Sequence, residues 1–97
     1  MLTVTTKEEA VYDFLYQDVG GNGERLSALR RTGPDDHDSK DAPGGPMIQR
    51  RWYRVSVLAP MPPRIGDAMT LVLEPPKPEA PPIVRHTSIV MSVVGTF

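Results

Sequence analysis

The sequence predicts a small, β-dominated α+β domain, in which an antiparallel sheet or partial β-barrel carries one N-terminal helix. Three observations support this fold class. The C-terminal half contains three runs rich in β-branched and aromatic residues, which are typical of strands. Eleven prolines and eight glycines among 97 residues favour short strands and long loops. A helix-start pattern near the N-terminus precedes an apolar stripe at helical spacing.

The length and composition of the chain exclude several classes of protein. A chain of 97 residues forms a single domain with a small core. The lack of cysteine excludes disulfides, thiolate metal sites and cysteine nucleophiles. No apolar run approaches the ~18–20 residues that a membrane span needs, and the N-terminal segment lacks the basic lead of a secretory signal. We therefore expect a soluble, cytoplasmic protein with no membrane contact.

The N-terminal segment, residues 1–31, allows two interpretations. Leu2–Thr5 fits a short edge strand or an extended entry. Thr6–Glu9 then fits a capping box, and the helical stripe that would follow consists of Ala10, Val11, Phe14 and Leu15. Alternating aromatic residues in the same segment also fit a strand, with Gly20–Gly23 turning the chain into a return strand at Glu24–Arg31. We favour the helix because of the capping box.

Residues 32–46 have no periodicity, and their Gly, Pro and Asp content predicts a flexible acidic loop. The β core, residues 47–97, follows this loop. Its predicted strands are Gln49–Ala59, Ala68–Glu74 and Ile83–Val94, separated by proline-rich corners. The last two strands flank Pro75–Pro82, so we expect them to pair as an antiparallel hairpin.

Strand alternation and the helical stripe together predict the residues of the core. These are Phe14, Leu15, Tyr53, Val55, Val57, Leu71, Leu73, Ile89, Met91 and Val93. The last strand carries apolar residues on both of its faces, which favours a central strand or one wall of a small barrel. Apolar surface that so thin a sheet leaves uncovered would be buried by self-association or in a larger assembly.

The strongest local feature is a run of arginine and aromatic residues at the start of the β core. Arg50, Trp52 and Arg54 would form one face of the strand, while Arg51 and Tyr53 would form the other. Arginine beside an exposed ring can bind an anion by charge and stacking, or contact a protein. We therefore take Arg50, Arg51, Trp52 and Arg54 as the ligand- or partner-binding residues. The alternative is that these residues only keep the edge of the sheet soluble, with the arginine stems packed over Trp52.

The other polar clusters in the sequence do not predict a metal site or a catalytic site. The acidic run Asp35–Asp41 lacks the glycine and closing glutamate of a helix–loop–helix calcium site, so we expect no metal. His86 and Ser88 lie about 6–7 Å apart along one strand face, too far for a base and its nucleophile. A cross-strand polar pair fits them better. No catalytic residue and no cofactor is predicted. The PxxP repeats within Pro75–Pro82 fit a stiff hairpin tip.

The turn Ile65-Gly66-Asp67, followed by a strand and then Arg85–Val90, resembles the end of many short hypothetical proteins encoded by phages. In those proteins a turn with glycine leads to a strand, and a strand with the pattern Thr-Ser-x-Val closes the chain, as Thr87–Val90 does here. The resemblance covers about a quarter of the chain. The resemblance implies that the protein is encoded by a phage, but it implies no activity. It also adds the virion to the locations where we expect the protein.

These observations predict a binding module without enzymatic activity, acting through protein–protein contact or by sequestering a small anionic ligand. One alternative is a structural component of a virion or another large assembly. Another is a small nucleic-acid-binding barrel, which the net charge of −1 does not favour.

Overall fold

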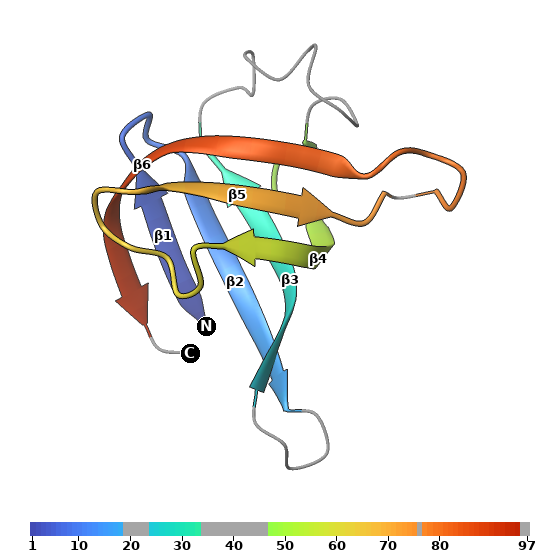
Figure 1. Ribbon diagram of the computed structural model, residues 1–97, viewed down its shortest axis with the longest axis horizontal. Coiled ribbons are helices and arrows are strands. Elements are labelled where there is room, and N and C mark those ends of the chain that lie inside the picture. The colour runs from blue at the N-terminus through green and yellow to red at the C-terminus, as the bar shows by residue number, and fades with distance from the viewer. Residues whose placement is uncertain (19–23, 34–46, 76, 96–97) are drawn as a thin grey trace.

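The computed structural model describes the backbone of residues 1–18, 24–33, 47–75 and 77–95, and the side chains of these residues except 16–18 and 24–27. Six antiparallel strands follow one another around a closed barrel, and β6 pairs back onto β1 (Figure 1). The strands are β1 (Leu2–Thr6), β2 (Val11–Asp18), β3 (Glu24–Thr32), β4 (Trp52–Ala59), β5 (Ala68–Leu73) and β6 (Ile83–Gly95). The prediction of a β-dominated fold built on an antiparallel sheet is therefore confirmed, and the sheet closes into a complete barrel where a sheet or partial barrel was expected.

The prediction of an N-terminal helix is wrong, because no helix occurs in the described parts of the chain. The residues of the expected capping box instead form the tight turn between β1 and β2. The amide of Thr6 donates to the carbonyl of Ala10 at 2.9 Å, and the amide of Glu9 donates to the carbonyl of Thr6 at 2.9 Å. Glu9 has a φ of 68°, which a helix does not allow. A polar pair spaced for a helix cap also suits a hairpin turn, and barrel pairing decides between them.

The alternative interpretation of the segment as a hairpin agrees with the structure, since β2 pairs with β3 from Val11↔Thr32 to Asp18↔Glu24. The predicted turn at Gly20–Gly23 lies outside the described residues. The first strand is not an edge, as β1 pairs with both β2 and β6. This double pairing places Leu2 directly opposite Gly95, so the first strand lies beside the last (Figure 1).

The barrel interior is filled by apolar side chains from all six strands. Among the predicted core residues, Phe14, Tyr53, Leu71 and Leu73 are buried, and Val55 and Val93 pack against the buried cluster. The remaining predictions, namely Leu15, Val57, Ile89 and Met91, are wrong because these side chains are exposed. The interior also takes residues that are absent from the predicted core, including Leu2, Val4, Leu29, Leu58, Met69 and Val90.

Irregular pairing explains most of these errors, because each bulge exchanges the inner and outer faces of a strand. The register between β4 and β5 shifts between Val55 and Val57, so Leu58 rather than Val57 points inward. In β6 the register shifts against β5 and again against β1. Val90 consequently takes the buried position that alternation assigned to its neighbours Ile89 and Met91.

The predicted hairpin of β5 and β6 is confirmed, and its proline-rich tip projects beyond the barrel (Figure 1). The outer face of the sheet formed by β4, β5 and β6 carries a cross-strand row of valines. Val57 opposes Val72, and Val72 opposes Val84. Val57 is 47% exposed, and the other two valines are half-buried. Both faces of this part of the barrel are therefore apolar.

The acidic loop predicted over residues 32–46 falls, from residue 34 onward, outside the described residues. Within the part of the chain that the structure covers, no helix is long and apolar enough to cross a membrane.

Candidate functional site

The arginine-rich run enters β4 through a tight turn. The amide of Arg51 donates to the carbonyl of Ile48 at 3.4 Å, and Arg50 sits in the left-handed region with a φ of 64°. Glycine or asparagine is favoured at such a position, and another residue there costs of order 1 kcal/mol. The amide of Arg50 also donates to the carbonyl of Arg31 at 2.9 Å, which ties the turn to β3. The turn thus holds an arginine at a position where backbone preference alone would select a smaller residue.

Tyr53 supports this turn from inside the barrel. Its ring is buried, and its hydroxyl accepts a hydrogen bond from the amide of Ile48 at 2.9 Å. The guanidinium of Arg51 lies over the Tyr53 ring, with 5.9 Å between its central carbon and the ring centroid. Because Tyr53 is fixed at both ends, the exposed side chain of Arg51 rests on a rigid surface, and less conformational entropy is lost when it binds.

Trp52 belongs to a row of directly opposed residues on the outside of β1 to β4. The hydroxyl of Thr3 donates to one carboxylate oxygen of Asp13 at 2.8 Å, and Arg30 donates to the other oxygen at 3.0 Å. The guanidinium of Arg30 then lies over the Trp52 ring, 4.7 Å from its centroid. The register pairs each of these residues with the next. The row neutralises Arg30 and fixes the indole, which remains 39% exposed.

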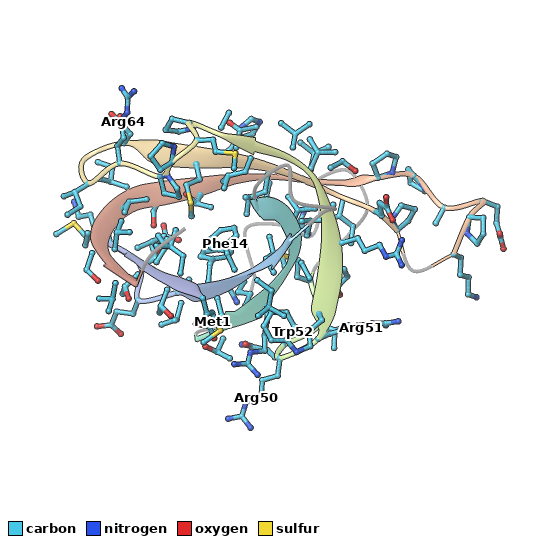
Figure 2. All side chains as sticks on the ribbon, turned by 90° about the horizontal axis from the view of Figure 1, so that it is seen from below. Met1, Phe14, Arg50, Arg51, Trp52 and Arg64 are labelled. Atoms are coloured by element: carbon cyan, nitrogen blue, oxygen red, sulfur yellow. The ribbon has the colours of Figure 1, made fainter. Side chains whose placement is uncertain are left out.

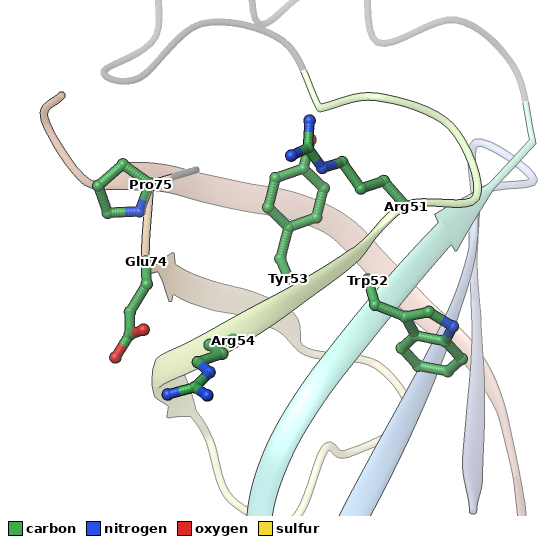
Figure 3. A pocket seen from close by; sticks show the side chains of 6 residues that line it. All are labelled: Arg51, Trp52, Tyr53, Arg54, Glu74 and Pro75. Carbon is green, nitrogen blue, oxygen red and sulfur yellow. The ribbon is translucent and has the colours of Figure 1, made fainter. Parts of the chain in front are cut away.

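A pocket of about 250 Å³ opens where the start of β4 meets the end of β5. Its lining residues are Arg51, Trp52, Tyr53, Arg54, Glu74 and Pro75 (Figure 3). The amide of Glu74 donates to the carbonyl of Arg54 at 2.9 Å, which fixes the two strand ends against each other. Trp52 is among the lining residues, and Figure 3 shows its indole on the side of the β4 ribbon away from Arg51 and Tyr53.

Three of the four predicted site residues therefore meet at one pocket, namely Arg51, Trp52 and Arg54. Arg50 is not among the lining residues and lies in the adjoining turn, exposed to solvent. The predicted split of the run between two strand faces is confirmed for Trp52 and Tyr53. Arg51 lies on the same side of the β4 ribbon as Tyr53, as predicted, although it precedes the strand and its side chain is exposed (Figure 3).

Sequence reasoning missed three participants in this region. Arg30 stacks on the site tryptophan, and Glu74 and Pro75 line the pocket. The block of arginines at residues 25–31 was a visible signal for Arg30, but only the register of β3 against β4 pairs it with Trp52. Glu74 and Pro75 follow β5, and pairing of Val55 with Leu73 brings them beside Arg54.

The arginines of the pocket carry charge that the described chain does not neutralise. Neither Arg51 nor Arg54 forms an ion pair with a described residue, whereas Arg30 is paired with Asp13. Arg50 and Arg51 also lie on the side of the molecule opposite Arg64 (Figure 2). The arrangement can bind an anionic group through charge-assisted hydrogen bonds from guanidinium groups.

The other sequence candidates lie elsewhere. His86 lies near Thr70, with 3.1 Å between its Nδ1 and the threonine hydroxyl, and Ser88 accepts from the amide of Glu8 at 3.3 Å. These are polar contacts between neighbouring segments, as the sequence predicted for His86. The acidic run Asp35–Asp41 lies outside the described residues. Across the described ranges, no three His, Asp or Glu side chains are grouped so that they could hold a metal ion.

Comparisons with protein-family models, with curated proteins and with solved structures give no match for this chain.

Proposed function

We propose that the protein is a binding module that docks an acidic segment of a partner protein. The contact is made by the arginine surface, which consists of Arg50, Arg51, Trp52 and Arg54. The observation that carries the proposal is the pocket in which the exposed guanidinium groups of Arg51 and Arg54 lack a carboxylate partner among the described residues. An acidic segment would supply the missing charge, and the exposed indole would supply apolar contact area.

The size of the pocket favours a protein partner over a small anionic ligand. Sites for small molecules usually enclose about 300–1,000 Å³ and bury most of the ligand. This pocket measures about 250 Å³, and four of its lining residues are exposed. A side chain projecting from a larger partner needs no such enclosure, because the surrounding contact excludes water.

Binding to nucleic acid receives less support. Proteins that bind a phosphate backbone present many cationic groups, and affinity depends on the number of phosphates they neutralise. The chain has a net charge of −1, and the pocket itself contains the carboxylate of Glu74. A catalytic pair of His86 and Ser88 receives no support, since their side chains contact different neighbouring segments.

The proposal is tested by titrating the protein with poly-L-glutamate and following Trp52, its single tryptophan. The double variant Arg51→Gln/Arg54→Gln is expected to bind about tenfold more weakly, because two exposed charge pairs are removed. Added salt should weaken wild-type binding. Arg64→Gln is the matched control, since Arg64 is exposed and lies on the opposite side (Figure 2). Equal affinity for the double variant and this control would remove the arginine surface from the proposal.

A second function, a structural role in a larger assembly such as a virion, is supported by the outer valine row. Val57, Val72 and Val84 form an uncharged row across three strands, although an antiparallel sheet that faces water usually has polar residues there. A contact between two copies places equivalent surfaces against each other, and a row without charge brings no like-charge repulsion. We propose a second copy of the chain as the occupant of this face.

A further inference from the structure

The pocket on the arginine surface combines two cationic residues with one acidic residue. Arg51 directly precedes β4, Arg54 lies near the start of that strand, and Glu74 directly follows β5. The backbone hydrogen bond from Glu74 to Arg54 holds their main chains together at 2.9 Å. Glu74 forms no ion pair with either arginine, so its carboxylate does not saturate them. It instead lowers the positive potential that an incoming anion meets.

We propose that Glu74 is a specificity-determining residue that makes the pocket selective for carboxylate groups against phosphate groups. This inference rests on the proposed function and names the chemistry of the partner. The formal charge of the pocket is +1, from two arginines and one glutamate. One carboxylate brings the total to zero. A phosphate monoester, which carries about −1.5 to −2 at neutral pH, leaves a net negative site.

The cost of removing each anion from water turns this difference in charge into a difference in affinity between carboxylate and phosphate. The free energy of removing an ion from water rises with the square of its charge, whereas its attraction to the pocket rises only linearly. A strongly positive pocket therefore favours a dianion, and a weakly positive pocket favours a monoanion. Glu74 makes the pocket weakly positive, so it favours a monoanion. Its negative charge repels a dianion more strongly than a monoanion, which discriminates against phosphate.

The charge balance also indicates the form of the partner segment. Because one carboxylate brings the pocket to neutrality, the occupant that fits is a protein segment that presents a single acidic side chain to the pocket, flanked by uncharged residues.

The test compares two capped peptides, Gly-Gly-Glu-Gly-Gly and the same sequence with phosphoserine in place of glutamate. Affinities are measured by Trp52 fluorescence for the wild type, Glu74→Gln and Glu79→Gln. Glu79 is an exposed acid of the β5–β6 tip that does not line the pocket, so its variant is the matched control. The wild type is expected to bind the glutamate peptide at least as tightly as the phosphoserine peptide.

Glu74→Gln should raise the ratio of phosphoserine to glutamate affinity by about two- to fivefold, the range expected for one exposed charge interaction. Glu79→Gln should leave the ratio unchanged. An unchanged ratio in Glu74→Gln, or a wild type that prefers phosphoserine, would overturn the inference while binding through the arginines stands. Tighter wild-type binding to a short oligothymidylate than to either peptide would point to nucleic acid and overturn it as well. The proposed function would instead be overturned if Arg51→Gln/Arg54→Gln bound the glutamate peptide as tightly as the wild type does.

Discussion

Replacing Asp13 with alanine tests whether the outer row of β1 to β4 holds the site in place. The carboxylate accepts from Thr3 at 2.8 Å and from Arg30 at 3.0 Å, so the variant removes both bonds. The Asp13 side chain is 13% exposed and that of Arg30 is 35% exposed. A hydrogen bond to a charged group contributes ~1.5–3 kcal/mol, but solvent screening at Arg30 reduces its pair to ~1 kcal/mol.

With ~1 kcal/mol for the bond to Thr3, the free energy of unfolding should fall by about 2 kcal/mol, which lowers Tm by about 10 °C in a domain of this size. Urea unfolding monitored by Trp52 measures this change. Native Trp52 emission should also shift, because Arg30 loses the partner that holds it over the ring. Glu8→Ala, which removes an exposed carboxylate from the β1–β2 turn, is the control.

A double-mutant cycle with Arg30→Gln separates the ion pair from the bond to Thr3. Asp13→Ala should cost less in the Arg30→Gln background than in the wild type. The row does not hold the site if Asp13→Ala costs no more than Glu8→Ala, or if its cost is the same in both backgrounds.

Two further predictions concern the barrel. Phe14→Ala should destabilise the protein by about 3–5 kcal/mol, since this ring is fully buried, whereas Leu15→Ala should cost less than about 1 kcal/mol because Leu15 is 37% exposed. Urea unfolding of both variants checks this, and similar costs would contradict the assigned faces of β2. If a second copy covers the outer valine row, Val57→Lys should lower the mass measured by light scattering at equal concentration, with little loss of stability. An assembly that persists in Val57→Lys, or a wild type that is monomeric throughout, would exclude this contact.

Local pattern predicted the later strands well and the N-terminal segment poorly. In β5 the alternation is regular, so Leu71 and Leu73 are buried as expected, and Met69 is buried on the same face. Thr6–Glu9 gave a helix signal because the spacing of a capping box is the same whether a helix or a strand comes after it. The long-range pairing of Leu2 with Gly95 is invisible to any local rule, yet it makes β1 an interior strand.

The faces of β4 and β6 and the composition of the site required the structure for a related reason. A bulge leaves no mark in residue types, so Val57 and Ile89 read as inward although their neighbours Leu58 and Val90 are the buried residues. The arginine run was found by composition alone. Its neighbour Glu74, on which the inferred selectivity depends, is distant in sequence and comes near only through the pairing of β4 with β5.

Amide chemical shifts measured while the capped glutamate peptide is added test the binding proposal most directly. We expect the largest changes on residues 50–55 and 73–74, which surround the pocket, and we expect Arg51→Gln/Arg54→Gln to reduce them at the same peptide concentration. Changes centred on the turn at residues 64–67, or no changes at peptide concentrations well above those of the protein, would contradict binding at the arginine surface.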